Sequence, residues 1–159
     1  MIFLKILLVF SFLIVLWQDV QSREVYWFLF PIIGVCCGFL YFLNTKPELF
    51  LISIFMNLIF LSILLLVIYL YSKYKLKSSL KTSIGSGDVL LFFALCLSFS
   101  SVSFITCFVL SLTFSLVLHL LFKKRDSIKT VPLAGYMSLF FVLVYLGSWT
   151  GLIDSLYII

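Results

Sequence analysis

Long apolar runs separated by short polar connections make up most of the chain. A helix needs about 20 apolar residues to cross a hydrocarbon core that is about 30 Å thick. On this basis residues 2–17 form a slightly short first span, whose helix can continue through Gln18 and Asp19, and residues 25–43 and 49–71 form the next two. The pattern predicts a protein built from membrane-spanning helices.

The apolar run at 88–122 is too long to be one span. As a single helix its 35 residues would reach about 52 Å at 1.5 Å per residue, well beyond the membrane. The serine-rich segment 98–103 is the predicted turn, so the run gives two short spans, and residues 131–147 give a sixth. We therefore expect an all-α integral membrane protein in which residues 1–159 form a single domain, a six-transmembrane-helix bundle.

Composition agrees with this class and excludes a water-soluble globule. The chain is 64% hydrophobic and 11% charged, with a mean hydropathy of +1.29, so it has too little polar surface to cover a soluble protein of 159 residues. In a membrane protein the net charge of +5 has to be interpreted by loop position, and we expect no nucleic-acid partner. All four cysteines lie in apolar runs and lack paired CxxC spacing, so we expect packing residues, no metal site and no cofactor.

Basic residues gather on one side of the predicted bundle. Nine of the eleven Lys and Arg residues follow the first, third and fifth spans: Arg23, Lys73, Lys75, Lys77, Lys81, Lys123, Lys124, Arg125 and Lys129. The other side has Lys5 and Lys46. The positive-inside rule predicts that these three connections face the cytoplasm and that both termini face away from it. We expect a multi-pass protein of the cytoplasmic (inner) cell membrane whose lysines contact anionic lipid headgroups.

Two acidic residues share one predicted membrane face. Asp19 lies at the cytoplasmic end of the first span and Asp88 at the cytoplasmic start of the fourth, whereas the other acids lie in charged loops or on the far side. Two adjacent carboxyl groups can hydrolyse a peptide bond without a metal, because one can deprotonate a water while the other protonates the scissile carbonyl. We therefore expect Asp19 and Asp88 to be a catalytic pair at the cytoplasmic face.

The residues beside this pair have expected roles as well. Gly85 and Gly87 lack a Cβ, so they allow unusual backbone angles and the close approach of an extended substrate strand, and Ser86 can cap the helix that follows. Arg23 lies four residues after Asp19, so it either pairs with that carboxylate on a continuing helix or anchors the chain at the headgroups. The dipoles of the two helices favour an ionised Asp88 as base and a protonated Asp19 as acid.

Three segments carry a resemblance to a known family. They are DVQSREV at 19–25, GSGDVLL at 85–91 and KTVPLAG at 129–135, in that order along the chain. With them the sequence resembles the type IV prepilin peptidases and archaeal preflagellin peptidases, which are membrane aspartic proteases of the GxGD type. The resemblance covers nearly the whole chain, including the six-span layout.

The resemblance implies an aspartic endopeptidase that cleaves the leader peptides of pilin-like precursor proteins at the cytoplasmic membrane face. It implies catalytic roles for Asp19 and Asp88, and it places Pro132 and Gly135 at the start of the last helix. The residues that we expect to contact the substrate or to let its backbone approach are Gly85, Ser86, Gly87, Arg23, Pro132 and Gly135. The chain departs from the family at Tyr26 and Trp27, where members commonly have Pro and Asn, and at Leu90, where they have Lys. It also has nothing that corresponds to the cysteine-containing segment associated with methylation, so the resemblance implies a peptidase alone.

Two alternatives remain open on the sequence. The GxGD string and PLAG also faintly resemble presenilin and signal-peptide-peptidase enzymes, although the third motif of that family is Pro-Ala-Leu and its members have nine spans. A non-catalytic membrane assembly subunit would use the same helices for packing. A pore is poorly supported, because it would need a polar stripe along at least one span.

Overall fold

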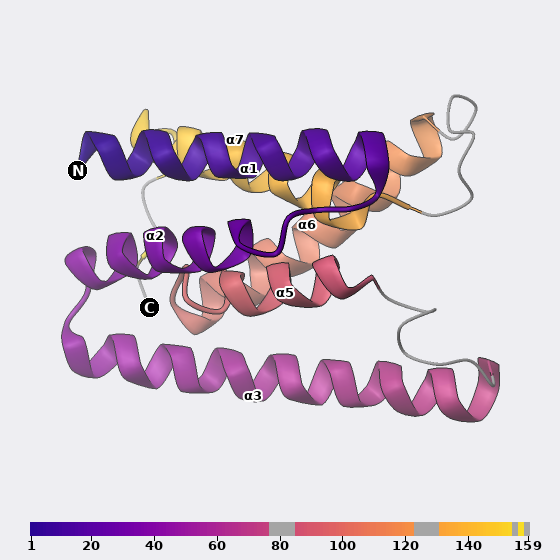
Figure 1. The fold of residues 1–159 in the computed structure, drawn as a ribbon. Helices are drawn as coiled ribbons and strands as arrows, with labels where there is room; N and C mark the ends of the chain where they lie inside the picture. Colours follow the sequence, from indigo (N-terminus) through magenta and orange to yellow (C-terminus); the bar gives the residue numbers. More distant parts are fainter. Residues whose placement is uncertain (77–84, 123–130, 154–155, 158–159) are drawn as a thin grey trace.

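The computed structural model describes residues 1–76, 85–122, 131–153 and 156–157. Within these ranges the chain is all-α, and Figure 1 shows the helices side by side. The elements are α1 (Ile2–Ser22), α2 (Leu29–Asn44), α3 (Pro47–Tyr71), the π-helical turn η1 (Ser72–Leu76), α5 (Ser86–Leu95), α6 (Ser101–Phe122) and α7 (Leu133–Trp149). Most of the basic residues that the orientation prediction uses lie in 77–84 and 123–130, outside the described residues.

Three of the described helices are long and apolar enough to cross a membrane: α1, α3 with its π-helical extension to Tyr74, and α6. The chain is thus a multi-pass membrane protein. The other three, α2, α5 and α7, are apolar but shorter. The 10 residues of α5 extend about 15 Å, half of a hydrocarbon core, so this helix does not cross a membrane unaided.

A turn inside the run at 88–122 is confirmed, but it lies at residues 96–100 rather than across 98–103. The expectation of two short spans is wrong for the second helix, because α5 has 10 residues and α6 has 22. The helix α5 ends at Leu95, residues 96–100 form turns and bends, and α6 begins at Ser101 and leads back. The side chain of Asn57 on α3 holds this turn, because its Nδ2 donates hydrogen bonds to the carbonyl oxygens of Cys96 at 3.0 Å and Phe99 at 3.1 Å. Backbone carbonyls at membrane depth need partners within the protein, and Asn57 supplies them where the helix is interrupted.

The distribution of polar and apolar side chains on helix α3 distinguishes a lipid environment from water. Its buried residues are Ser53, Asn57 and Leu61, which are four positions apart on one face of the helix. Its outward residues are mainly large and apolar, and Leu51 and Phe55 are about two-thirds exposed. A helix in water shows the opposite distribution. Polar side chains that face the bundle and apolar side chains that face outward are typical of a helix in lipid.

The core brings one end of α1 against the start of α7. Helix α1 packs on α7 and α2, and α2 packs on α5. In the centre the ring of Phe141 on α7 stacks on Phe12 of α1 and on Phe99 of the turn after α5. Figure 1 shows α1 beside α7, with the last turn of α1 and the first turn of α5 toward the same end of the molecule. This end holds both aspartates.

We predict that Asn57→Leu destabilises the protein by about 1–3 kcal/mol, because it leaves the carbonyls of Cys96 and Phe99 buried without a donor. The measurement is thermal unfolding of the detergent-solubilised chain. Ser62→Ala is the matched control on the same helix, because the Ser62 hydroxyl is exposed and bonds only to Leu58 O of its own helix. Equal stability of the Asn57 and Ser62 variants would show that the turn does not depend on Asn57.

Candidate active site

Asp19 lies in the last turn of α1, at the point where the helix leaves its apolar run. The helix continues to Ser22, as the sequence analysis allowed, and Arg23 ends it in the left-handed conformation with φ 58°. The Asp19 side chain points into the protein and is only 8% exposed. Its Oδ2 accepts a hydrogen bond of 2.6 Å from the backbone N–H of Gly135.

Asp88 lies in the first turn of α5. Gly85 is the N-cap residue of this helix, so Asp88 is its third residue. The Asp88 carboxylate accepts a hydrogen bond from the backbone N–H of Gly85, which is one half of a capping box, and a second from the backbone N–H of Ala134 to Oδ1 at 2.9 Å. The side chain is therefore fixed by two helices, its own and α7.

The start of α7 brings the two carboxyl groups together. The first N–H groups of a helix have no acceptor within the helix. At the start of α7 these groups bond to acceptors just before the helix or on other helices. Leu133 N–H donates to Val131 O at 2.9 Å, and Tyr136 N–H makes the first bond of the helical type, to Pro132 O at 3.1 Å. The two amides between them, those of Ala134 and Gly135, donate to Asp88 and Asp19 respectively. Consecutive amides thus hold the two aspartates, and the carboxyl groups interact electrostatically.

Gly135 allows α1 to come this close. A Cβ at position 135 would lie 3.2 Å from both Cβ and Oδ2 of Asp19 and 3.3 Å from Leu16 O. The backbone oxygen cannot move away alone, so a side chain at this position would push α1 from α7. Sequence analysis placed Pro132 and Gly135 at the start of the last helix only through the family resemblance. The structure places Pro132 at the N-cap of α7 and Gly135 against Asp19.

Two expectations for the GSGD segment are wrong. Gly85 has φ −62° and ψ 143°, and among the described glycines only Gly151 has a positive φ, so neither Gly85 nor Gly87 adopts an unusual backbone conformation. Ser86 is not the N-cap of α5, because the N-cap is Gly85, which has no side chain, and Ser86 is the first residue of the helix. The side chain that bonds to the N-cap amide is the carboxylate of Asp88. Gly85 and Ser86 are both exposed, so the backbone beside Asp88 is accessible.

Arg23 lies near Asp19 without continuing the helix. Because α1 ends at Ser22, the two residues are not a helical pair in consecutive turns, but the Arg23 guanidinium still interacts electrostatically with the Asp19 carboxylate. The Asp19 carboxylate also bonds to the backbone N–H of Gly135, so it lies at the positive amino-terminal end of the α7 dipole. The expected division into an ionised Asp88 and a protonated Asp19 used only the dipoles of α1 and α5. With α7 acting on both carboxylates, helix dipoles no longer separate their roles.

Ala134 is a further residue of the site, and the sequence did not predict it. Its contribution is a backbone N–H, which leaves no mark on side-chain chemistry, and the available signal was its position two residues after a proline that precedes an apolar run. In the described part of the chain, His, Cys, Asp and Glu side chains form no group of three or more that could hold a metal ion. The chemistry of this site is that of two neighbouring carboxyl groups, and two such groups resist simultaneous ionisation.

Comparison with known proteins returns no match to this chain among protein-family models, curated proteins or solved structures.

Proposed function

We propose that this protein is a membrane aspartic endopeptidase in which Asp19 and Asp88 activate the water that cleaves a peptide bond. The observation that carries the proposal is the pair of consecutive amides, Ala134 and Gly135, that hold the two carboxylates. The aspartates are 69 positions apart in the sequence and come from different helices, yet they interact electrostatically at one end of the bundle. Pairs of this kind are typical of aspartic protease chemistry.

In the proposed reaction the pair carries one proton. The ionised carboxylate takes a proton from water as the water oxygen attacks the scissile carbonyl carbon, and the other carboxyl group gives its proton to the carbonyl oxygen. The intermediate then has two hydroxyl groups on that carbon. As the C–N bond breaks, the leaving nitrogen takes the proton from the first carboxyl group, and one hydroxyl returns a proton to the second. The pair regains its starting state.

The proposed substrates are pilin-like precursors, cut between a short basic leader and a hydrophobic helix, as the family resemblance implies. Two features of the site support such a substrate. The backbone at Gly85 and Ser86 is exposed beside Asp88, so an extended strand can approach it. Large apolar side chains are exposed close to both aspartates in the sequence, Trp17 on α1 and Leu90 on α5, and they can contact a hydrophobic part of the precursor that remains in the bilayer. The tyrosine and tryptophan at positions 26 and 27 are exposed in the connection before α2, where they can affect specificity.

We further propose a six-span topology with the aspartates at the cytoplasmic face. The three shorter helices α2, α5 and α7 pack among the three long ones, and each contacts at least one of α1, α3 and α6. Under this topology the connections rich in lysine and arginine lie on the same side as Asp19 and Asp88.

A non-catalytic assembly subunit is the second candidate, and one observation favours it. Each carboxylate already accepts backbone hydrogen bonds, and the bonds of Asp88 to Gly85 and Ala134 would stabilise helix ends without any chemistry. An aspartate-to-asparagine change separates the two candidates, because an asparagine side-chain oxygen can still accept a backbone N–H but cannot act as an acid or a base.

We predict that Asp19→Asn and Asp88→Asn each lower precursor cleavage by at least about 100-fold, because both proton-transfer groups are needed in every turnover. Each variant is co-expressed with candidate pilin-like precursors, and the mature product is quantified by its size. Glu24→Gln, an exposed acid close to Asp19 in the sequence, is the matched control and should cleave normally. If either variant is folded and inserted and still cleaves at the normal rate, the proposed peptidase activity is wrong and the aspartates have a structural role.

We predict that Gly135→Ala lowers cleavage by about 100-fold, because the added methyl group displaces the Asp19 carboxylate from its partner, and misplacement by about 1 Å can cost that much. The control is Gly34→Ala, another buried helical glycine, where the nearest neighbour of an added Cβ is the flexible end of Leu97 at 3.4 Å. Cleavage rates and unfolding temperatures of both variants are compared. The proposed contact is refuted if the two variants lose activity equally.

The topology has its own test. A reporter enzyme fused after Ile159 should be active outside the cytoplasm, and one inserted near Lys77 should be active inside it, because the lysine-rich connections are retained on the cytoplasmic side. A cytoplasmic carboxyl terminus is incompatible with six spans in the proposed orientation.

A further inference from the structure

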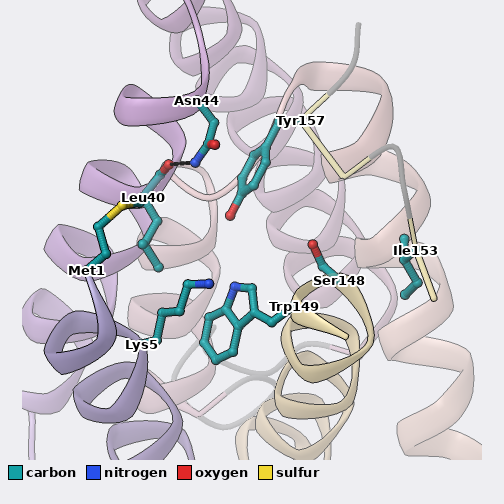
Figure 2. A pocket seen from close by; sticks show the side chains of 8 residues that line it. All are labelled: Met1, Lys5, Leu40, Asn44, Ser148, Trp149, Ile153 and Tyr157. Atoms are coloured by element: carbon teal, nitrogen blue, oxygen red, sulfur yellow. Dashed lines mark hydrogen bonds between the residues drawn. The ribbon is translucent and has the colours of Figure 1, made fainter. Parts of the chain in front are cut away.

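A cavity of about 340 Å³ lies at the end of the bundle opposite the aspartates. It is formed by the first turns of α1, the last turns of α2 and α7, and two residues that follow α7, Ile153 and Tyr157 (Figure 2). On α1, Lys5 lines it 14 residues before Asp19, which is about 21 Å along the helix. Its volume falls within the range of small-molecule sites. The cavity is therefore separate from the candidate active site.

Hydrogen-bond donors line this cavity. Figure 2 shows the ammonium group of Lys5, the indole N–H side of Trp149 and the hydroxyl of Tyr157 directed toward its interior. The ammonium lies over the Trp149 ring, 4.8 Å from its centre, which holds the cation at the cavity wall. Ser148 adds a hydroxyl, and Asn44 adds an amide that also donates to Leu40 O at 2.7 Å. None of the described residues that line it is acidic, so the donors and the cation favour an anion.

The position of the cavity indicates what kind of anion it would meet. It opens at the ends of apolar helices, where lipid headgroups lie, and Trp149 and Tyr157 are the side chains that favour this level of a membrane. Just outside it on α1, Ile2, Phe3 and Ile6 are each more than 60% exposed and offer an apolar surface to acyl chains. A ligand with an anionic head and apolar tails fits both parts.

We propose that this cavity binds the phosphate group of an anionic phospholipid, with Lys5 as its principal contact. The Lys5 ammonium forms a charge-assisted hydrogen bond to a phosphate oxygen, and Ser148 and Tyr157 donate to the others. The acyl chains lie along the exposed apolar side of α1. The inference does not depend on the peptidase function, because none of these residues belongs to the candidate active site.

The experiment uses the full-length chain in detergent with Trp149 as its one remaining tryptophan, in a Trp17→Phe, Trp27→Phe background. Trp149 fluorescence is followed during titration with dioleoylphosphatidylglycerol, dioleoylphosphatidylcholine or inorganic phosphate. We expect a saturable change with phosphatidylglycerol and a much weaker one with the zwitterionic lipid. In Lys5→Gln the apparent affinity for phosphatidylglycerol should fall about tenfold, and Lys5→Arg should retain it. Lys46→Gln removes a cation that does not line the cavity and should bind normally.

Three results would overturn the proposal. The first is an unchanged affinity in Lys5→Gln, provided that its unfolding temperature without lipid shows it to be folded. If that variant does not fold, Ser148→Ala takes its place, and a normal affinity in that variant counts equally against the site. The second is equal binding of both lipids. The third is saturation by inorganic phosphate at the concentrations that suffice for phosphatidylglycerol, which would assign the cavity to free phosphate.

Discussion

The site depends on which groups accept hydrogen bonds from the backbone N–H groups in the first turn of α7. A helix begins with N–H groups that have no partner within it, and where such groups are buried the protein has to supply their hydrogen-bond acceptors. In this protein the amides of Ala134 and Gly135 bond to the carboxylates of Asp88 and Asp19. One structural requirement, the satisfaction of a helix end, thereby places two acidic side chains from distant parts of the chain side by side. Gly135 is part of the same arrangement, since a side chain there would separate α1 from α7.

Buried polar groups are bonded within the protein at other places in the fold as well. The turn between α5 and α6 exposes carbonyl groups in the interior, and Asn57 donates to two of them. The hydroxyl of Tyr41 on α2 donates to Ser53 of α3 at 2.9 Å, which links two helices by another buried polar bond. In each case a polar group faces the bundle and apolar side chains face outward. Lipid gives apolar side chains no reason to gather inside, so polar bonds and close packing must fix the helix arrangement.

Much of the fold could be predicted because hydrophobic length is a strong physical constraint. The apolar runs located the six helices, and the excess length of 88–122 required the turn that is observed. The helix boundaries were predicted less well than the helix positions. The second helix begins at Leu29 rather than near Val25, because the chain reverses after Arg23 and the backbone N–H of Tyr26 bonds to the Gln18 side chain at 3.2 Å. Val25 to Phe28 are apolar, so hydropathy cannot distinguish this connection from a helix.

For the candidate site, membrane depth predicted that Asp19 and Asp88 would share one end of the bundle, and the structure places both there. The details that sequence reasoning got wrong are local. Gly85, not Ser86, is the N-cap of α5, because the backbone of Gly85 is extended and the helix begins at Ser86. The role of α7 in the site could not be predicted, for another reason. Every residue except proline has the same backbone N–H donor, so only the fold determines which of these donors bond to the aspartates.

The central claim is that Asp19 and Asp88 form one coupled pair that shares a proton, rather than two independent helix caps. Infrared spectroscopy of the protein with ¹³C-labelled aspartate carboxyl groups tests it most directly, because protonated and ionised carboxyl groups absorb at different frequencies. The account predicts one protonated aspartate band at mildly acidic pH, where an isolated aspartate is already ionised, and this band shifts or disappears in both Asp19→Asn and Asp88→Asn. It is contradicted if all aspartates are ionised at that pH, or if the protonated band is unaffected by both substitutions.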